Sequence, residues 1–115
     1  MKLNILRDFS YTPGPRYIVE GEFSGEQFRQ EKLRAAMTQA IADDDTLEIE
    51  LDGTAGYGRS FFEEAFGGLV RIDKMDYSDI VSHLKIISTE EPEWIDKIAK
   101  YLKKAHDEEA VAKKK

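Results

Sequence analysis

The chain has no cysteine, only two histidines and only three prolines. Without cysteine it can form no disulfide, no thiolate nucleophile and no cysteine metal site, and this composition suits a reducing compartment. Neither His83 nor His106 has a partner at the His-x-x-x-His type of spacing that is typical of metal sites. We therefore expect neither a metal nor a cofactor.

Long apolar runs and positive charge are also scarce. No run of about 18 apolar residues is present, and residues 1–8 lack the apolar stretch of a signal peptide, so we expect a cytoplasmic protein with no membrane partner. The formal net charge of -6 repels a phosphate backbone, so we expect no nucleic-acid partner. The one dense basic run is residues 113–115.

The composition is that of a single globular domain. Hydrophobic residues make up 41% of the 115 residues and charged residues 35%, which indicates a soluble protein with a highly charged surface. A chain of this length can bury one sizeable core without a metal or a disulfide. We assign residues 1–108 to the domain and residues 109–115 to a polar C-terminal tail, with the last helix fraying from residue 106.

Four segments carry the signals of β-strands. Polar and apolar residues alternate along residues 2–8 and 46–52, and β-branched, aromatic or aliphatic residues concentrate in residues 16–20 and 83–88. Two prolines and a glycine at residues 13–15 predict a turn, so the second strand is expected to run antiparallel to the first.

The third of these strands also predicts how the sheet is covered. Leu47, Ile49 and Leu51 alternate there with Glu48 and Glu50. A strand between two helix layers would be apolar on both faces. The alternation therefore predicts a sheet with helices on one side and water on the other.

Three longer helices are expected. The first begins at a capping box formed by Ser24 and Gln27, carries an apolar stripe, and ends at the three acids of residues 43–45. The last begins near Pro92, because proline suits the first turn of a helix. One short helical turn is expected within residues 76–82.

The second of the longer helices begins at a capping box formed by Ser60 and Glu63. Gly67 and Gly68 lie inside it, where each costs about 1 kcal/mol relative to alanine, so we expect a neighbouring element to approach closely there. The resulting order is strand, strand, helix, strand, helix, strand, helix. This order predicts an α/β fold with parallel neighbouring strands and right-handed crossovers.

The turn formed by residues 53–60 has two interpretations. Gly53 and Gly58 have the spacing of the phosphate loop Gly-x-x-x-x-Gly-Lys-Ser/Thr, with Arg59 in place of the lysine. A guanidinium differs in size and geometry from an ammonium, and the one candidate for the Walker B aspartate, Asp52, lies at the loop itself. A nucleotide- or phosphate-binding protein that uses this loop is therefore the alternative to a regulatory domain.

Two patches of sequence carry a resemblance to a known family. The first contains Pro-Gly-Pro-Arg-Tyr at residues 13–17, Gly21, and Ser-Gly-Glu-x-Phe-Arg at residues 24–29; the second contains Leu-Asp at residues 51–52 and Ser-Phe-Phe-Glu-Glu-Ala-Phe-Gly at residues 60–67. Over residues 13–87 the chain resembles the STAS superfamily of bacterial anti-sigma-factor antagonists. It is most similar to a bacterial group described as STAS-like domains of unknown function.

The resemblance implies a STAS-like, mixed sheet of four to five strands with helices mainly on one face, and a non-enzymatic signalling role. In the antagonists, a kinase-like ATPase that also binds a sigma factor phosphorylates a serine at the start of the helix after the central strand. Ser60 corresponds to that serine, so it is the phosphorylation candidate, and a kinase-like ATPase or anti-sigma factor is the expected protein partner. The alternative role for Ser60 is a plain N-cap, which would contribute about 1 kcal/mol.

The expected contact surface is the turn together with the exposed part of the second helix. The antagonists have an Asp-Ser-Ser-Gly type of sequence where this chain has Gly-Arg-Ser-Phe at residues 58–61. No catalytic residue is expected. Arg16 and Tyr17 are a further possible contact surface. The candidates for binding a partner or an anion are Gly56, Tyr57, Gly58, Arg59 and Phe61.

Overall fold

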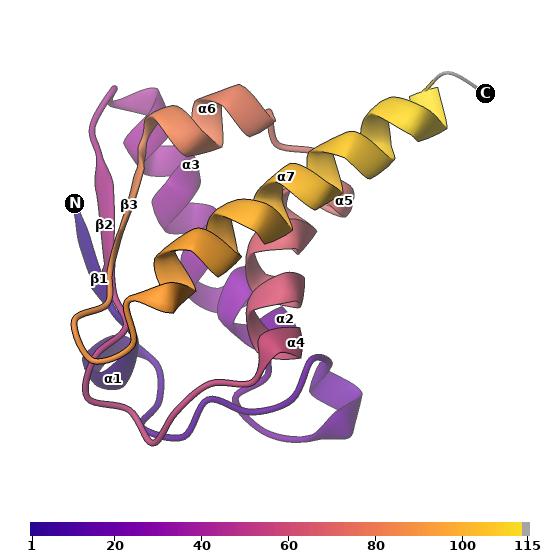
Figure 1. Ribbon diagram of the computed structural model, residues 1–115. Helices are drawn as coiled ribbons and strands as arrows, with labels where there is room; N and C mark the ends of the chain where they lie inside the picture. Colours follow the sequence, from indigo (N-terminus) through magenta and orange to yellow (C-terminus); the bar gives the residue numbers. More distant parts are fainter. Residues whose placement is uncertain (114–115) are drawn as a thin grey trace.

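A computed structural model describes residues 1–113 of the chain as three strands with helices between and after them (Figure 1). The helix α2–η2–α3 and the helix α4–η3–α5 are each continuous, and each contains a π-helical segment. The elements in chain order are β1 (Lys2–Asn4), α1 (Ile5–Asp8), the 3-10 helix η1 (Ile18–Glu20), α2 (Gly25–Phe28), the π-helical η2 (Arg29–Leu33), α3 (Arg34–Ala42), β2 (Leu47–Glu50), α4 (Arg59–Phe62), the π-helical η3 (Glu63–Gly67), α5 (Gly68–Arg71), α6 (Tyr77–Ser82), β3 (Leu84–Ile87) and α7 (Glu93–Lys113).

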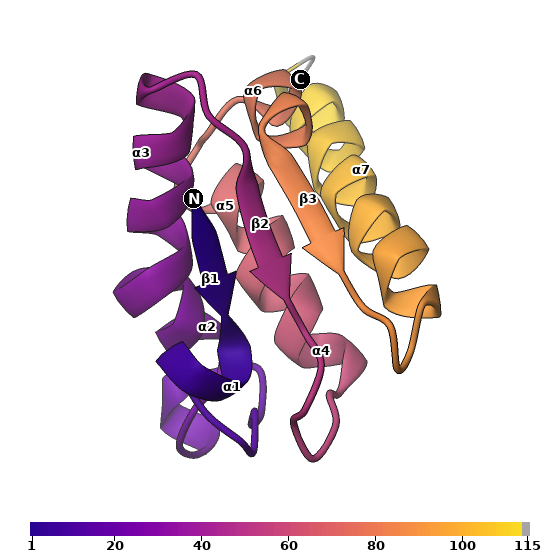
Figure 2. The same cartoon turned by 90° about the vertical axis from the view of Figure 1, so that its left-hand side faces the viewer.

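The strands form one parallel sheet in the order β1-β2-β3. In this register Ile49 lies between Leu3 and Ile86. The longer helices pack against one face of the sheet (Figure 2). The other face carries Lys2, Glu48, Glu50 and Lys85. Leu47 and Ile49 are buried and Glu50 is exposed, so the predicted alternation is confirmed and the sheet has a single helix layer.

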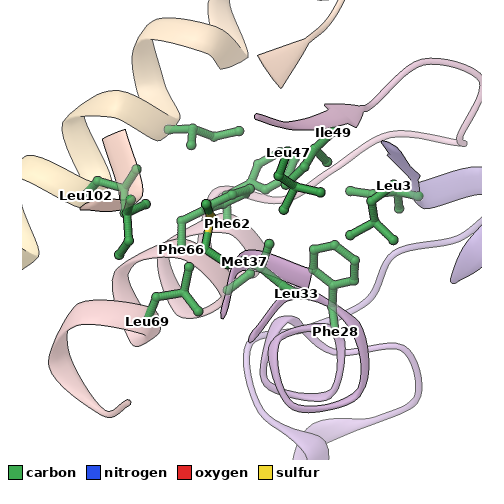
Figure 3. Packing of buried hydrophobic residues seen from close by; sticks show 14 of the residues in the cluster. Leu3, Phe28, Leu33, Met37, Leu47, Ile49, Phe62, Phe66, Leu69 and Leu102 are labelled. Carbon is green, nitrogen blue, oxygen red and sulfur yellow. The ribbon is translucent and has the colours of Figure 1, made fainter. Parts of the chain in front are cut away.

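The core lies between the sheet and this helix layer. Leu47 and Ile49 point from β2 toward Phe62 of the second long helix, and Leu3 of β1 lies on the side of Phe28 of the first (Figure 3). Helix α7 is amphipathic, and its apolar face closes the helix layer. Its buried residues are Trp94, Ile98, Leu102 and Ala105.

The expected strand at residues 16–20 is wrong, because this segment binds to a helix end and not to a sheet. The carbonyls of Pro15 and Arg16 accept hydrogen bonds from the amides of Gly25 and Glu26, at 2.9 and 3.0 Å. These amides open α2 and would otherwise lack partners. The segment therefore folds as the short helix η1, and the sheet has three parallel strands in place of the mixed four to five.

The first strand is also shorter than its alternation predicts. Asn4 ends β1 and caps α1, since its side chain accepts a hydrogen bond from the Arg7 amide at 2.9 Å. The Asn4 amide donates in turn to the Asp8 carboxylate at 2.8 Å. This local pair of bonds converts the second half of residues 2–8 into a helical turn.

Most helix boundaries follow the sequence signals. Ser24 caps α2, with its hydroxyl accepting from the Gln27 amide at 3.0 Å, and α3 ends before the acids at residues 43–45. In a full capping box the Gln27 side chain would accept a hydrogen bond from the Ser24 amide. Here the Gln27 side chain accepts one from the Phe23 amide instead, at 3.0 Å. Helix α7 continues to Lys113, beyond the expected point of fraying, and residues 114–115 lie outside the described part of the chain.

Gly67 and Gly68 lie against arginine side chains and not, as expected, against a closely packed neighbouring backbone. A Cβ at Gly68 would overlap the guanidinium of Arg29, and one at Gly67 would overlap that of Arg71. These two glycines make room for side chains, whereas Gly25 is the place where two helix backbones come close. Within residues 1–113 no helix is both long and apolar enough to cross a membrane.

Candidate functional site

The candidate turn begins where β2 ends and is tied to the connection between β3 and α7. The Asp52 carboxylate accepts hydrogen bonds from the amides of Thr89 and Glu90, at 2.9 to 3.0 Å. These bonds favour the charged form, so they hold the pKa of Asp52 below its usual value. The Gly53 amide donates to the Glu90 carboxylate at 2.6 Å, so residues 52–53 are anchored from both directions.

The amides of the turn are used inside the protein, unlike those of a phosphate loop. The Ala55 amide donates to the Tyr11 carbonyl at 2.8 Å, and the Gly56 amide donates to the Thr54 hydroxyl at 3.3 Å. With the Gly53 amide bound to Glu90, three of the donors that would cradle an anion are occupied. These three amides are therefore unavailable to an anion in this conformation.

The cavity beneath the turn is also unsuited to a phosphate. Its volume is about 20 Å³, which is room for one water molecule, and three carboxylates are among its lining groups. Those carboxylates belong to Asp52, Glu90 and Glu91. A negative lining in so small a space opposes a negative ligand.

Two residues proposed as partner contacts anchor the turn to the core instead. The Tyr57 hydroxyl donates to the Leu51 carbonyl at 2.7 Å, and its ring packs on Phe62 with centroids 4.5 Å apart. Burial raises the pKa of the Tyr57 phenol to about 12. Phe61 is fully buried and its ring stacks on Phe28 at 5.8 Å, so the expectation that Phe61 contacts a partner is wrong.

The helix after the turn begins two residues earlier than the capping box predicts. Gly58 is the N-cap, and it provides no side-chain hydrogen bond. Ser60 is the second helical residue, so its assignment as N-cap and its capping box with Glu63 are wrong. The Ser60 side chain is half-buried, and its hydroxyl makes no hydrogen bond within residues 1–113.

The remaining candidates of the turn lie at the surface. Gly56 has φ of +130°, a conformation that favours glycine, and Gly58 has open space around the position of a Cβ. The side chain of Arg59 is 80% exposed. Gly56, Gly58 and Arg59 are thus free to contact another molecule.

A cluster of charges next to Ser60 was not predicted from the sequence. The Glu63 carboxylate lies 3.3 Å from Nη2 of Arg16 and 3.5 Å from Nε of Arg59. Ser60 and Glu63 are three residues apart in one helix, so their side chains occupy neighbouring positions on its surface. Arg16, Arg59, Ser60 and Glu63 are therefore one surface cluster, which we call the arginine–serine cluster.

The cluster lies where the two sequence patches that carry the family resemblance come together in the fold. A Cβ at Gly25 would overlap the backbone of Phe61, which places the start of α2 directly against α4. Behind the cluster, Arg29 of the first patch pairs with Glu64 of the second at 2.9 Å, and both side chains are buried. Gly25, Phe28 and Arg29 of the first patch and Phe61 and Glu64 of the second thus build the contact between the two helices.

The exposed neighbours of the cluster include apolar side chains. Tyr17, Ile18 and Val19 of the loop before α2 have exposed fractions of 43%, 48% and 91%. They follow Arg16 in the chain, so the suggested contact at Arg16 and Tyr17 adjoins the turn at the same end of the molecule (Figure 1). Among the described residues no group of three His, Cys, Asp or Glu side chains is arranged to hold a metal ion.

Comparison with known proteins gives one match. No curated protein and no solved structure matches the chain significantly. Residues 24–94, which include α2 to β3 and the start of α7, match the model of a family described as a STAS-like domain of unknown function. This match includes the second patch and the helical part of the first, and the chain therefore belongs to the STAS-like family.

Proposed function

We propose that the protein is a non-enzymatic regulatory domain that binds a protein partner through the arginine–serine cluster and the adjoining turn. By resemblance to the anti-sigma-factor antagonists, the partner is a kinase-like ATPase or an anti-sigma factor. The observation that carries the proposal is the position of Ser60: its hydroxyl makes no hydrogen bond within residues 1–113, and it lies one helical turn from Glu63, whose carboxylate pairs with Arg16 and Arg59.

The rigidity of the turn supports a docking role. The hydrogen bonds of Asp52, Gly53 and Tyr57 hold the backbone on both sides of Gly56, so little conformational entropy would be lost when a partner binds. The exposed side chains of Tyr17 and Arg59 are of residue types that are enriched at protein interfaces.

The electrostatics of the cluster support regulation by phosphorylation of Ser60. A phosphate group adds roughly -1.5 to -2 charges at neutral pH. It would repel the neighbouring Glu63 carboxylate and compete with it for Arg16 and Arg59, which now pair with Glu63 at 3.3 and 3.5 Å. The start of the helix also favours a negative group. The modification would therefore rearrange the two arginines while the fold tolerates the new charge.

The proposal is tested by comparing partner binding of wild type with Ser60→Glu and Ser60→Ala. Partners are captured from extract of the source cells, identified by mass spectrometry, and titrated against each purified variant by calorimetry. We expect Ser60→Glu to change the affinity of at least one captured ATPase or anti-sigma factor about tenfold or more, and Ser60→Ala to bind like wild type.

Ser78 provides the matched control, because it is exposed and is the second residue of α6, as Ser60 is of α4. Ser78→Glu adds the same charge at the same helical position but away from the cluster, and it should leave the affinity unchanged. Equal affinities for Ser60→Glu, Ser78→Glu and wild type would refute the switch. A rise in melting temperature with nucleotides in place of protein binding would favour the alternative function.

A further inference from the structure

Helix α7 carries a run of positive charge on its exposed surface. Residues 97–104 contain four lysines and no acid, in a chain whose formal net charge is -6. Lys97, Lys100 and Lys104 are exposed and make no ion pair within the described part of the chain, whereas Lys103 is paired at 2.9 Å with an aspartate one turn further along. The first three ammonium groups are therefore available to another molecule.

The spacing of these lysines works against the helix that carries them. Lys97 and Lys100 are three residues apart and Lys100 and Lys104 are four apart, so their ammonium groups are neighbours on the helix surface. Like charges at these separations destabilise a helix, and protein surfaces usually intersperse the two signs. Glu93 and Glu108 lie one turn beyond the lysines, yet neither pairs with them in residues 1–113. The stability of α7 therefore gives no reason for the run of charge.

Tyr101 connects this part of α7 to the arginine–serine cluster. Burial raises the pKa of its phenol, the Glu63 carboxylate raises it further, and the Arg59 guanidinium lowers it. The phenol therefore lies close to both charged groups of the cluster. Lys97 and Lys104 are four and three residues from Tyr101, so they lie on the same side of the helix. The lysines thus continue the positive surface of the cluster.

The turn meets the same side of α7. The rings of Tyr57 and Trp94 are in edge contact with their centres 6.3 Å apart, and Nζ of Lys97 lies 4.8 Å from the centre of the Trp94 ring. Helix α7 packs across the helix α4–η3–α5 (Figure 1). One positive surface therefore runs from the turn and the cluster along α7, and we call it the basic strip. Its cations are Arg16, Arg59, Lys97, Lys100 and Lys104.

We propose that the basic strip binds an acidic segment of the protein partner, an inference that rests on the proposed function and names the chemistry of that partner. Within residues 1–113 the five cations share one ion-pair partner, Glu63, so positive charge is in excess along the strip. The rest of the protein is acidic, since the chain as a whole carries a net charge of -6. Complementarity of charge therefore selects a partner surface rich in carboxylates.

The length of the strip favours a short acidic segment over a nucleic acid. Lys97 and Lys104 are seven residues apart along the helix, which is about 10 Å. Glu93 precedes the lysines and residues 107–109 are all acidic, so a long polyanion would meet negative charge beyond either end. A helical segment with aspartate or glutamate at every third or fourth residue over about two turns would match the spacing of the lysines.

A synthetic oligoglutamate of about eight residues tests the strip without the biological partner. Titrated into isotope-labelled protein at low salt and followed by NMR, it should shift the amide signals of Arg59 and of residues 97–104, and added salt should reverse the shifts. Absence of binding, or equally large shifts around Lys32 and Lys85, would overturn the proposal. An oligothymidylate of equal charge is the matched polyanion, and its tighter binding would overturn the proposal in favour of a nucleic acid.

Reversal of charge identifies the lysines that bind. Lys100→Glu/Lys104→Glu should raise the dissociation constant of the oligoglutamate about tenfold, because two attractive contacts become repulsive. Lys97 is left in place because its ammonium lies on an aromatic ring. The matched control is Lys32→Glu/Lys85→Glu, which makes the same change of net charge at two exposed lysines outside the strip. It should change the dissociation constant by less than about twofold.

The melting temperature of each double variant shows whether it is folded. Equal loss of binding in the two folded double variants would show that only net charge acts, and would overturn the proposal. Binding of oligoglutamate to the strip with no effect of Ser60→Glu on a captured partner would leave the strip in place and reject the switch. An effect of Ser60→Glu on a captured partner, with oligoglutamate binding unchanged in Lys100→Glu/Lys104→Glu, would retain the proposed function and reject the acidic segment.

Discussion

Replacing Arg29 with methionine is expected to destabilise the protein strongly at neutral pH. The Arg29 side chain is 1% exposed, and its guanidinium lies 2.9 Å from the Glu64 carboxylate and 3.2 Å from that of Asp73. Methionine keeps the apolar stem but leaves the Glu64 carboxylate without its guanidinium partner, and leaves Asp73 with Arg34 alone. A Cβ at Gly68 would overlap this guanidinium, which indicates how closely the helix is built around it.

The size of the effect follows from the burial of the pair. Removing one partner of a buried ion pair costs about 3–5 kcal/mol, because an uncompensated charge remains. That is a large part of the roughly 5–15 kcal/mol by which domains of this kind are stable. Arg34→Met is the matched control, since Arg34 binds the same Asp73 at 3.0 Å but is 47% exposed. Its loss should cost about 0–1 kcal/mol.

The cost of Arg29→Met should shrink in mild acid. Burial already raises the pKa of Glu64, and the charge of Arg29 opposes this rise. Without Arg29 the pKa of Glu64 in the folded state rises further. A carboxyl whose pKa is raised on folding stabilises the fold below its ordinary pKa, and this contribution is lost as the pH rises through the raised value. The variant is therefore weakest, relative to wild type, at neutral pH.

Urea unfolding followed by the fluorescence of Trp94, the single tryptophan, measures these differences. Wild type, Arg29→Met and Arg34→Met are compared at pH about 7 and about 5, at one protein concentration. A loss below about 1 kcal/mol for Arg29→Met at neutral pH would refute the reasoning. A loss that grows in acid would refute it equally.

Three further predictions concern the turn and the contact between helices. Tyr57→Phe removes the 2.7 Å hydrogen bond to the Leu51 carbonyl and should cost about 1–3 kcal/mol in urea unfolding; a loss near zero would show that this bond does not hold the turn. In alkaline titration followed by phenolate absorbance, Tyr57 should ionise with a pKa of about 12, so its contribution to stability is lost as the pH rises from its ordinary value of 10.0 through about 12; ionisation at the ordinary value would contradict its burial. Gly25→Ala should lower the free energy of unfolding by about 1–3 kcal/mol, because its methyl group would overlap the backbone of Phe61. Gly58→Ala, in open space, should cost at most about 0.5–1 kcal/mol, because alanine is a poorer N-cap than glycine. Equal stability of the two alanine variants in thermal unfolding would contradict the close approach.

The family and the general layout were predictable because their signals are local. The alternation of apolar and charged residues along β2 indicates which face of the strand is exposed to water. The spacing of apolar residues in a helix likewise indicates its buried stripe, independently of the rest of the chain. The sequences around Ser24 and Gly67 carried the family resemblance. The single helix layer followed from the same alternation, since Glu48 and Glu50 need a face open to water.

The errors arose where a segment had two possible partners. Residues 16–20 have the composition of a strand, yet the carbonyls of Pro15 and Arg16 cap α2. Ser60 has the sequence context of an N-cap, yet the helix begins at Arg59, after Gly58. In the first case the competing partner is the start of α2, and in the second the start of the helix depends on how Tyr57 anchors the turn. Neither can be read from the local sequence pattern.

The amino-acid sequence by itself determined the order of the main helices and strands, the one-sided sheet and the family, because periodicity and capping act over a few residues. Only the tertiary structure decided that Arg16 meets Glu63 and Arg59 around Ser60, that Phe61 is in the core, and that β3 is an open edge. These depend on distances between segments far apart in the chain. Such distances are set by the packing of the whole core.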